Sequence, residues 1–148
     1  MGVLKSLRNE SAAQFITSAD ELRTFTAITV TKLSQKYRDL GNLHAYKLAQ
    51  AILDDLTRAN SLYFSKDRPQ NYQARRDLFD KALGNLNCLS THIVYLCELA
   101  DTFNKDKSDN QKKKPKITDK RWLKWASMIN KVRDLVVKVR DSDSQRLK

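Results

Sequence analysis

The sequence has few of the residues that interrupt regular structure, because its 148 residues include only three glycines and two prolines. A β protein with many tight turns needs more of both, so this scarcity favours a few long helices. No run of about 18 apolar residues occurs, which argues against a membrane-spanning segment. The N-terminus lacks the apolar core of a signal peptide, so we do not expect export.

Cysteine and histidine are equally scarce, with two of each. If Cys88 and Cys97 lie on one helix, they are about 13 Å apart along its axis, which is too far for a disulfide. They are typical of small buried side chains in a reducing compartment. Two His and two Cys at unrelated spacings do not form a metal-ligand set, and we expect no metal and no other cofactor.

Positive charge is what the sequence has in excess, with 28 Lys and Arg against 17 Asp and Glu and a net charge of +11. Residues 1–103 hold thirteen basic and eleven acidic side chains, whereas residues 104–124 hold nine basic and three acidic ones. Such an excess favours a polyanionic partner. The sequence at 104–117 is rich in Lys, Asp, Asn and Gln, which predicts a mobile basic loop.

Apolar residues recur at helical spacing in four segments, which are about 18–40, 43–64, 70–103 and 118–140. Ser18 begins a capping-box pattern, Gly41 separates the first two segments, and Pro69 suits the first turn of the third. The first three segments are joined by short connections, so we predict an all-α, antiparallel up-down four-helix bundle. Residues 1–17 are expected to form an N-terminal arm and residues 141–148 a C-terminal tail.

The third segment is apolar nearly all round, because Glu98 is its only charged residue between Ala82 and Ala100. A helix of this kind needs a cover on its outer side, so we predict that contacts between subunits cover it. Gly84, in mid-helix, fits a close approach of another backbone. The alternative is a monomer in which this helix is simply the most buried of the four. The expected interface residues are Phe79, Leu83, Cys88, Val94, Tyr95 and Leu99.

The fourth segment separates its apolar and cationic residues. Trp122 and Trp125 begin an apolar stripe that ends at Val139, and this position favours core packing over stacking on bases. Four lysines fall within about 40° of one another around the helix, in a row about 27 Å long. The row is either a track for phosphates or an ordinary solvated face. The expected nucleic-acid contacts are Lys120, Lys124, Lys131 and Lys138 of this row, together with Lys112, Lys113, Lys114, Lys116 and Arg121.

An enzymatic alternative comes from Arg38 and His44, which match the Arg-x(4–6)-His spacing of HEPN-type ribonucleases. In such a site the two residues handle the scissile phosphate and the proton transfer. Gly41 and Asn42 lie inside the motif, where a helix break would disrupt that arrangement. We interpret His92 as a satisfied interior histidine.

Three stretches of the sequence stand out together. They are Asp54-Asp55-Leu56-Thr57-Arg58-Ala59-Asn60, Tyr72-Gln73-Ala74-Arg75-Arg76-Asp77-Leu78-Phe79-Asp80-Lys81-Ala82-Leu83, and Val139-Arg140-Asp141-Ser142-Asp143 at the end of a Trp-bearing helix. Together they resemble the accessory variability determinant (Avd) proteins of bacterial and phage diversity-generating retroelements, which are relatives of the S23-type four-helix bundles.

The resemblance implies a cytoplasmic, bacterial or phage-encoded protein that is not an enzyme. Proteins of this family are homopentameric basic barrels that bind the element's reverse transcriptase and its template-repeat RNA, with the cDNA as a further candidate ligand, and support mutagenic cDNA synthesis. No membrane partner is implied. An S23-like bundle that binds structured RNA without a polymerase is the alternative.

The resemblance also adds three site residues, because Arg58, Arg75 and Arg76 match basic positions of the family. They become candidates for contact with RNA or with the polymerase. The alternative is that Arg75 and Arg76 pair with Asp77, Asp80 or a neighbouring helix. The lysine-rich loop departs from the family pattern and is either an extra RNA clamp or a variable insertion.

Overall fold

The computed structural model of the chain describes residues 10–33, 41–65, 67, 69–105 and 119–147. Within them lie four helices and no strand, which confirms the predicted all-helical chain. They are α2 (Glu10–Thr31), α3 (Leu43–Ser61), α4 (Pro69–Lys105) and α5 (Asp119–Leu147).

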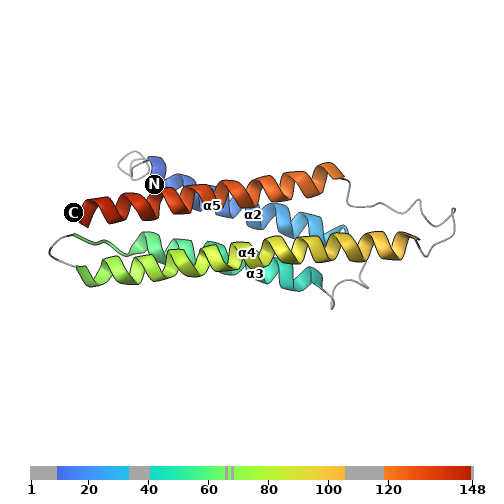
Figure 1. Cartoon of the computed structure of the whole chain (residues 1–148), viewed down its shortest axis with the longest axis horizontal. Coiled ribbons are helices and arrows are strands. Elements are labelled where there is room, and N and C mark those ends of the chain that lie inside the picture. Colours follow the sequence, from blue (N-terminus) through green and yellow to red (C-terminus); the bar gives the residue numbers. More distant parts are fainter. Residues whose placement is uncertain (1–9, 34–40, 66, 68, 106–118, 148) are drawn as a thin grey trace.

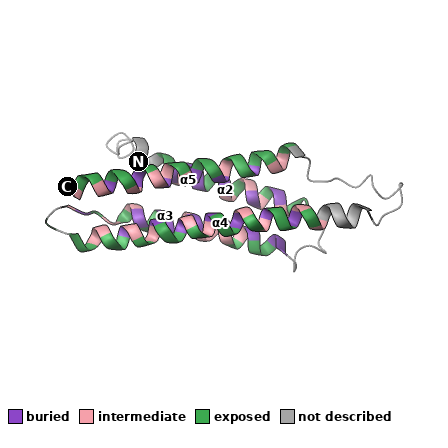
Figure 2. Cartoon of the chain, in the orientation of Figure 1, coloured by how far each residue is buried: buried purple, intermediate pink, exposed green. Residues whose placement is uncertain are grey.

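The four helices lie side by side along the long axis of the molecule, and the start of α2 and the end of α5 lie toward the same end of it (Figure 1). α2 packs on α3 and α5, and α4 packs on the same two helices. Each helix therefore has two neighbours, as in a four-helix bundle. Buried residues follow a stripe along each helix, with exposed residues on the other side (Figure 2).

The first helix begins earlier than predicted. α2 already includes Glu10, so the predicted N-terminal arm is wrong from that residue onward. Ser18 is a buried residue in mid-helix and not a cap. Phe15 is fully buried and lies four and seven residues before Ala19 and Leu22, so the apolar spacing of the helix continues back through the predicted arm.

The ends of the first and last helices also differ from the prediction. α2 ends at Thr31, where Lys32 donates its backbone N–H to the carbonyl of Thr29 (3.1 Å). A hydrogen bond between residues three apart is typical of the tighter last turn of a helix. Residues 34–40, predicted to be helical, lie outside the described part. α5 continues to Leu147, so the predicted C-terminal tail is helical.

The predicted apolar stripe of α5 is confirmed as part of the core, with Trp125, Ile129, Val132, Val136 and Val139 all buried. The indole N–H of Trp125 donates to the hydroxyl of Thr26 (2.9 Å), which in turn donates to the carbonyl of Leu22 (2.7 Å). This chain of bonds satisfies two buried polar groups between α2 and α5, the indole N–H of Trp125 and the hydroxyl of Thr26. Trp122 is half-buried and stacks on Trp125.

The start of α3 approaches α4 closely through a glycine. His92 on α4 donates from Nε2 to the carbonyl of Gly41 (2.7 Å). A Cβ atom at Gly41 would lie 2.7 Å from the same Nε2 atom and 2.8 Å from Cδ2 of Leu96. The chain therefore needs glycine here because a side chain would separate the two helices.

Replacing Gly41 with alanine is expected to lower the free energy of unfolding by about 1–3 kcal/mol, because the added methyl overpacks the contact with His92 and Leu96. Urea unfolding followed by circular dichroism measures this change. Gly84 is the matched control, since a Cβ atom there meets nothing within 4 Å. Gly84→Ala is expected to stabilise the helix by about 0.5–1 kcal/mol. Equal responses at the two glycines would contradict the close approach.

Candidate nucleic-acid interface

The positive charge of the four helices is concentrated in α5. This helix holds eight basic and four acidic residues, a net charge of +4. α2 carries a net charge of −2, while the charges of α3 and of α4 each sum to zero. α5 is therefore the described element that suits a polyanion best.

The predicted lysine row lies on the outer side of α5, since Lys120, Lys124, Lys131 and Lys138 are all exposed. Lys120, Lys131 and Lys138 have no ion pair or hydrogen bond to any described residue. Asp134 is exposed between Lys131 and Lys138 without pairing to a described cation. Three of the four ammonium groups are thus available to an external anion.

Lys124 has a defined position on the neighbouring helix. Its Nζ atom lies 5.2 Å from the centroid of the Phe25 ring on α2, a cation–π distance. The contact involves a ring face and leaves the three N–H donors of the ammonium without a described acceptor. Lys124 can therefore still meet a phosphate while its side chain is held by Phe25.

Apolar side chains are exposed near the N-terminal half of the row, and sequence reasoning missed them. Leu123 is 70% exposed on α5 and Ile28, one turn beyond Phe25 on α2, is 49% exposed. Leu123 also lines a groove of about 280 Å³ between α4 and α5, with Val94 and Trp122. The sequence did hold a signal for the exposure of Leu123. Around the helix axis this residue lies about 100° from Trp122, and therefore off the apolar stripe.

The remaining predicted lysines cannot be placed on this surface. Lys112, Lys113, Lys114 and Lys116 lie outside the described residues, as does most of the predicted loop at 104–117. Arg121, in the first turns of α5, is half-buried. The described interface therefore consists of the four lysines of the row and their neighbours on α2 and α5.

Arg58 is exposed on α3, but it is engaged with an acid of its own helix. Its Nη1 atom lies 3.2 Å from Oδ1 of Asp55, a carboxylate that is almost completely buried. Nζ of Lys81 on α4 lies 3.9 Å from the same oxygen. The pair of cations balances a buried carboxylate, which lowers the charge that Arg58 offers to RNA.

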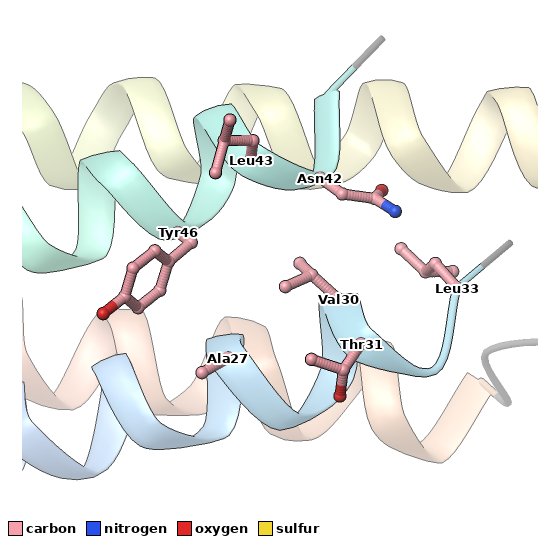
Figure 3. Close-up of a pocket in the computed structure, with 7 residues that line it drawn as sticks. All are labelled: Ala27, Val30, Thr31, Leu33, Asn42, Leu43 and Tyr46. Carbon is pink, nitrogen blue, oxygen red and sulfur yellow. The ribbon is translucent and has the colours of Figure 1, made fainter. Parts of the chain in front are cut away.

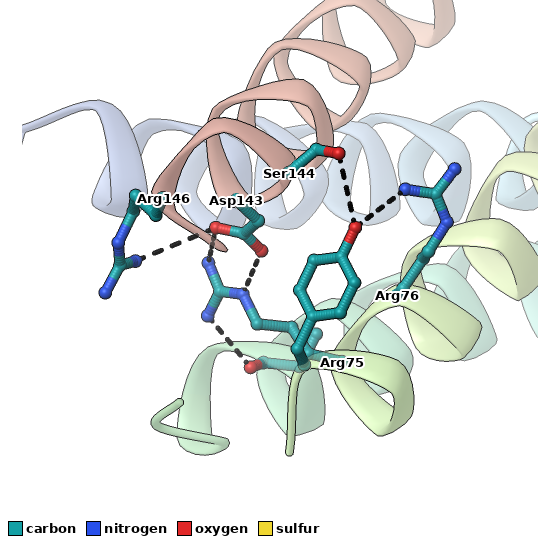
Figure 4. A network of polar contacts seen from close by, with 7 residues as sticks. Arg75, Arg76, Asp143, Ser144 and Arg146 are labelled. Atoms are coloured by element: carbon teal, nitrogen blue, oxygen red, sulfur yellow. Dashed lines mark hydrogen bonds and ion pairs between the residues drawn. The ribbon is translucent and has the colours of Figure 1, made fainter. Parts of the chain in front are cut away.

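Arg75 was predicted to contact RNA or the polymerase, but the structure places its side chain inside the bundle. The residue is buried, with Nε 2.5 Å from Oδ2 of Asp143 on α5 and Nη1 donating to the carbonyl of Ala59 on α3 (3.1 Å). Its guanidinium also lies over the ring of Phe79. The alternative of pairing with a neighbouring helix is confirmed for this residue (Figure 4).

Arg76, the next residue of α4, takes part in a second set of hydrogen bonds near the end of α5. Its Nη1 atom donates to the hydroxyl of Tyr72 (3.1 Å), and that hydroxyl forms a long hydrogen bond with Ser144 (3.4 Å; Figure 4). The bond with Ser144 lowers the pKa of Tyr72, and the Arg76 cation adds to this. The Tyr72 hydroxyl raises the pKa of Arg76 in return. Arg76 is half-buried, and Tyr72 links it to Ser144, which lies beyond the last lysine of the row on α5.

The predicted oligomer interface on α4 divides into buried and exposed residues. Phe79 is fully buried within the single chain and packs edge-on against Phe15 (5.7 Å between centroids), so it does not belong to the exposed face of α4. Leu83 and Leu99 are half-buried. The exposed members are Val94, Tyr95 and Cys88, and exposure of Cys88 also corrects the expectation that it is buried. Gly84 faces open space, so no described residue of the chain approaches it closely.

The two histidines lie against each other, with His44 on α3 and His92 on α4 at 4.8 Å between ring centroids. Arg38, the other member of the ribonuclease motif, lies outside the described residues. Among the residues that are described, no three His, Cys, Asp or Glu side chains gather as a metal site requires. None of the described helices combines the length and apolar character that a membrane crossing needs.

A second groove, of about 480 Å³, lies between the end of α2 and the start of α3. Figure 3 shows Ala27, Val30 and Leu33 on one side and Leu43 and Tyr46 on the other. None of the described residues that line this groove carries a charge.

No protein-family model, no curated protein and no solved structure matches this chain. Function therefore has to follow from the side chains that the fold brings to the surface.

Proposed function

We propose that this chain is a non-catalytic RNA-binding accessory protein of a diversity-generating retroelement. In this role it binds the element's reverse transcriptase and template-repeat RNA in the bacterial cytoplasm and supports mutagenic cDNA synthesis. The observation that carries the RNA-binding part is the row of exposed lysines on α5. The polymerase and the retroelement come from the resemblance of three sequence stretches to Avd proteins.

The chemistry of the row suits phosphates more than bases. Each lysine is a compact cation on a flexible stem, without the planar fork with which arginine reads guanine. Lysine contacts with phosphates release counterions and fix the position of a strand but carry no sequence information. The polymerase and the structure of the RNA would then provide selectivity.

The proposal includes an antiparallel up-down bundle that assembles into a homopentameric barrel. Support for self-association comes from the outer face of α4, where no charged residue occurs between Lys81 and Glu98. Val94 and Tyr95 are 55% and 41% exposed on this helix, and Gly84 leaves room for another backbone. Assembly would cover these side chains and bring several lysine rows into one particle.

Replacing Lys120, Lys124, Lys131 and Lys138 together with glutamine is expected to weaken binding of template-repeat RNA at least about tenfold at moderate salt. Because each lost phosphate contact removes about 0.7–0.9 from the slope of log affinity against log salt, that slope should flatten by about 3 units. Fluorescence anisotropy at a series of KCl concentrations measures both quantities.

Lys47→Gln is the matched control, since Lys47 is exposed on α3, which packs on α2 and α4. Unchanged affinity and slope in the quadruple variant would overturn the interface on α5. A reverse-transcriptase gene beside this one would supply the partner, and co-purification of the two proteins tests the interaction. Specific RNA cleavage that is lost in His44→Ala would instead support the ribonuclease alternative.

A further inference from the structure

The four lysines of the row form a straight line, because a helix places residues of equal angle parallel to its axis. From Lys120 to Lys138 the successive axial distances are about 6, 10.5 and 10.5 Å, at about 1.5 Å per residue. A ligand that meets all four ammonium groups must therefore present phosphates along a line about 27 Å long.

A nucleic-acid duplex does not present its phosphates in this way. Its backbones wind round the axis once in roughly 34 Å, so a strand that touches Lys120 has turned to the far side of the duplex before the row ends. A straight row then meets each backbone about once. An extended single strand can lie along the whole of α5 and bring a phosphate to each lysine.

The apolar surroundings of the row point in the same direction. Leu123, which is 70% exposed, precedes Lys124 on α5, and Ile28, which is 49% exposed, lies one turn beyond Phe25, whose ring contacts Lys124. A duplex stacks its base faces on one another, whereas an unpaired strand has free faces that gain from contact with apolar or aromatic side chains. The side chain of Lys124 is already held over Phe25, which keeps its cation beside this apolar surface.

This inference rests on the proposed RNA-binding role. We propose that the lysine row of α5 binds an extended, unpaired stretch of about four to six nucleotides, with the bases over Leu123 and Ile28. The row thereby discriminates against duplex RNA. The ligand class is a single strand in which phosphates meet Lys120, Lys124, Lys131 and Lys138 in order. This row thereby selects the unpaired regions of a folded RNA without reading their sequence.

The test compares one RNA strand of mixed, unstructured sequence with the same strand annealed to its complement. Anisotropy titrations of the full chain over a KCl series give affinity and salt slope for each probe. We expect the single strand to bind at least about fivefold more tightly than the duplex, with a salt slope of about −3 from four neutralised phosphates. Lys131→Gln with Lys138→Gln should remove about 1.4 from that slope.

Leu123→Ser separates the apolar contribution from charge, since this exposed side chain can change without disturbing the core. It should weaken the single strand about threefold at an unchanged salt slope and leave the duplex unaffected, while Lys47→Gln should affect neither probe.

Equal binding of both probes through the same lysines would overturn the single-strand inference and leave the proposed function standing. Tight single-strand binding that ignores the lysine substitutions would also overturn it. Absence of binding to either probe would overturn the proposed function itself.

Discussion

Replacing Arg75 with alanine is expected to lower the free energy of unfolding by about 3–5 kcal/mol, because it leaves the buried carboxylate of Asp143 without its partner. The carbonyl of Ala59, at the end of α3, also loses a donor. Urea unfolding of the purified variant measures the effect. If the variant is too unstable to purify, the double substitution Arg75→Met with Asp143→Leu should restore much of the stability, since an apolar pair can replace a buried ion pair.

Arg140→Ala provides the control for Arg75. Arg140 also joins α5 to α4, with its Nη1 atom 3.0 Å from Oδ1 of Asp80, but both side chains reach solvent. An exposed pair contributes about 0–1 kcal/mol. Similar losses in the two alanine variants would show that the Arg75 pair is not buried. A folded Arg75→Ala protein that loses RNA binding would return Arg75 to the interface.

Replacing Phe79 with alanine is expected to cost about 3–5 kcal/mol of unfolding free energy, since it empties a fully buried position against Phe15 and Arg75. The loss should be the same at every protein concentration if Phe79 belongs to the core of one subunit. Thermal and urea unfolding at two or more concentrations measure this. A loss that disappears on dilution would return Phe79 to an interface between subunits.

Val94→Asp is the counterpart of this substitution on the exposed side of α4. It removes no buried contact of the single chain, so the fold should survive with a change within about 1 kcal/mol. A charge on a covered apolar face opposes association, and light scattering should therefore show a smaller particle than the native protein forms. A monomeric native protein at micromolar concentration would contradict self-association.

The sequence predicted the helices well where apolar spacing was regular. The stripe from Trp125 to Val139 identified both a helix and its buried face, because a period of 3.6 residues leaves few alternatives. The helix ends were harder to predict. A capping-box pattern at Ser18 also occurs inside helices, and the polar stretch at 141–147 is helical although its composition is typical of a tail.

The candidate site likewise contains residues whose exposure the sequence predicted and residues whose burial it did not. The lysine row could be predicted because exposure follows from opposition to the apolar stripe. Burial of Arg75 could not, since its carboxylate partner is 68 residues away in the sequence. The burial of Phe79 could not be predicted for a related reason. Its partner Phe15 lies in the segment that the sequence predicts to be an N-terminal arm, so the pattern alone leaves the third helix with two equally apolar flanks.

The buried contacts of Arg75 have a consequence for substitutions at this position and at Asp143. Its guanidinium joins Ala59, from the first of the three stretches that resemble Avd proteins, to Asp143, from the third, and Arg75 itself belongs to the second. A single substitution at position 75 or 143 therefore leaves a buried charge without its partner, whereas a joint change of both to apolar residues does not. The ends of α3 and α5 and the start of α4 are held together at this one guanidinium, so a change there reaches three helices at once.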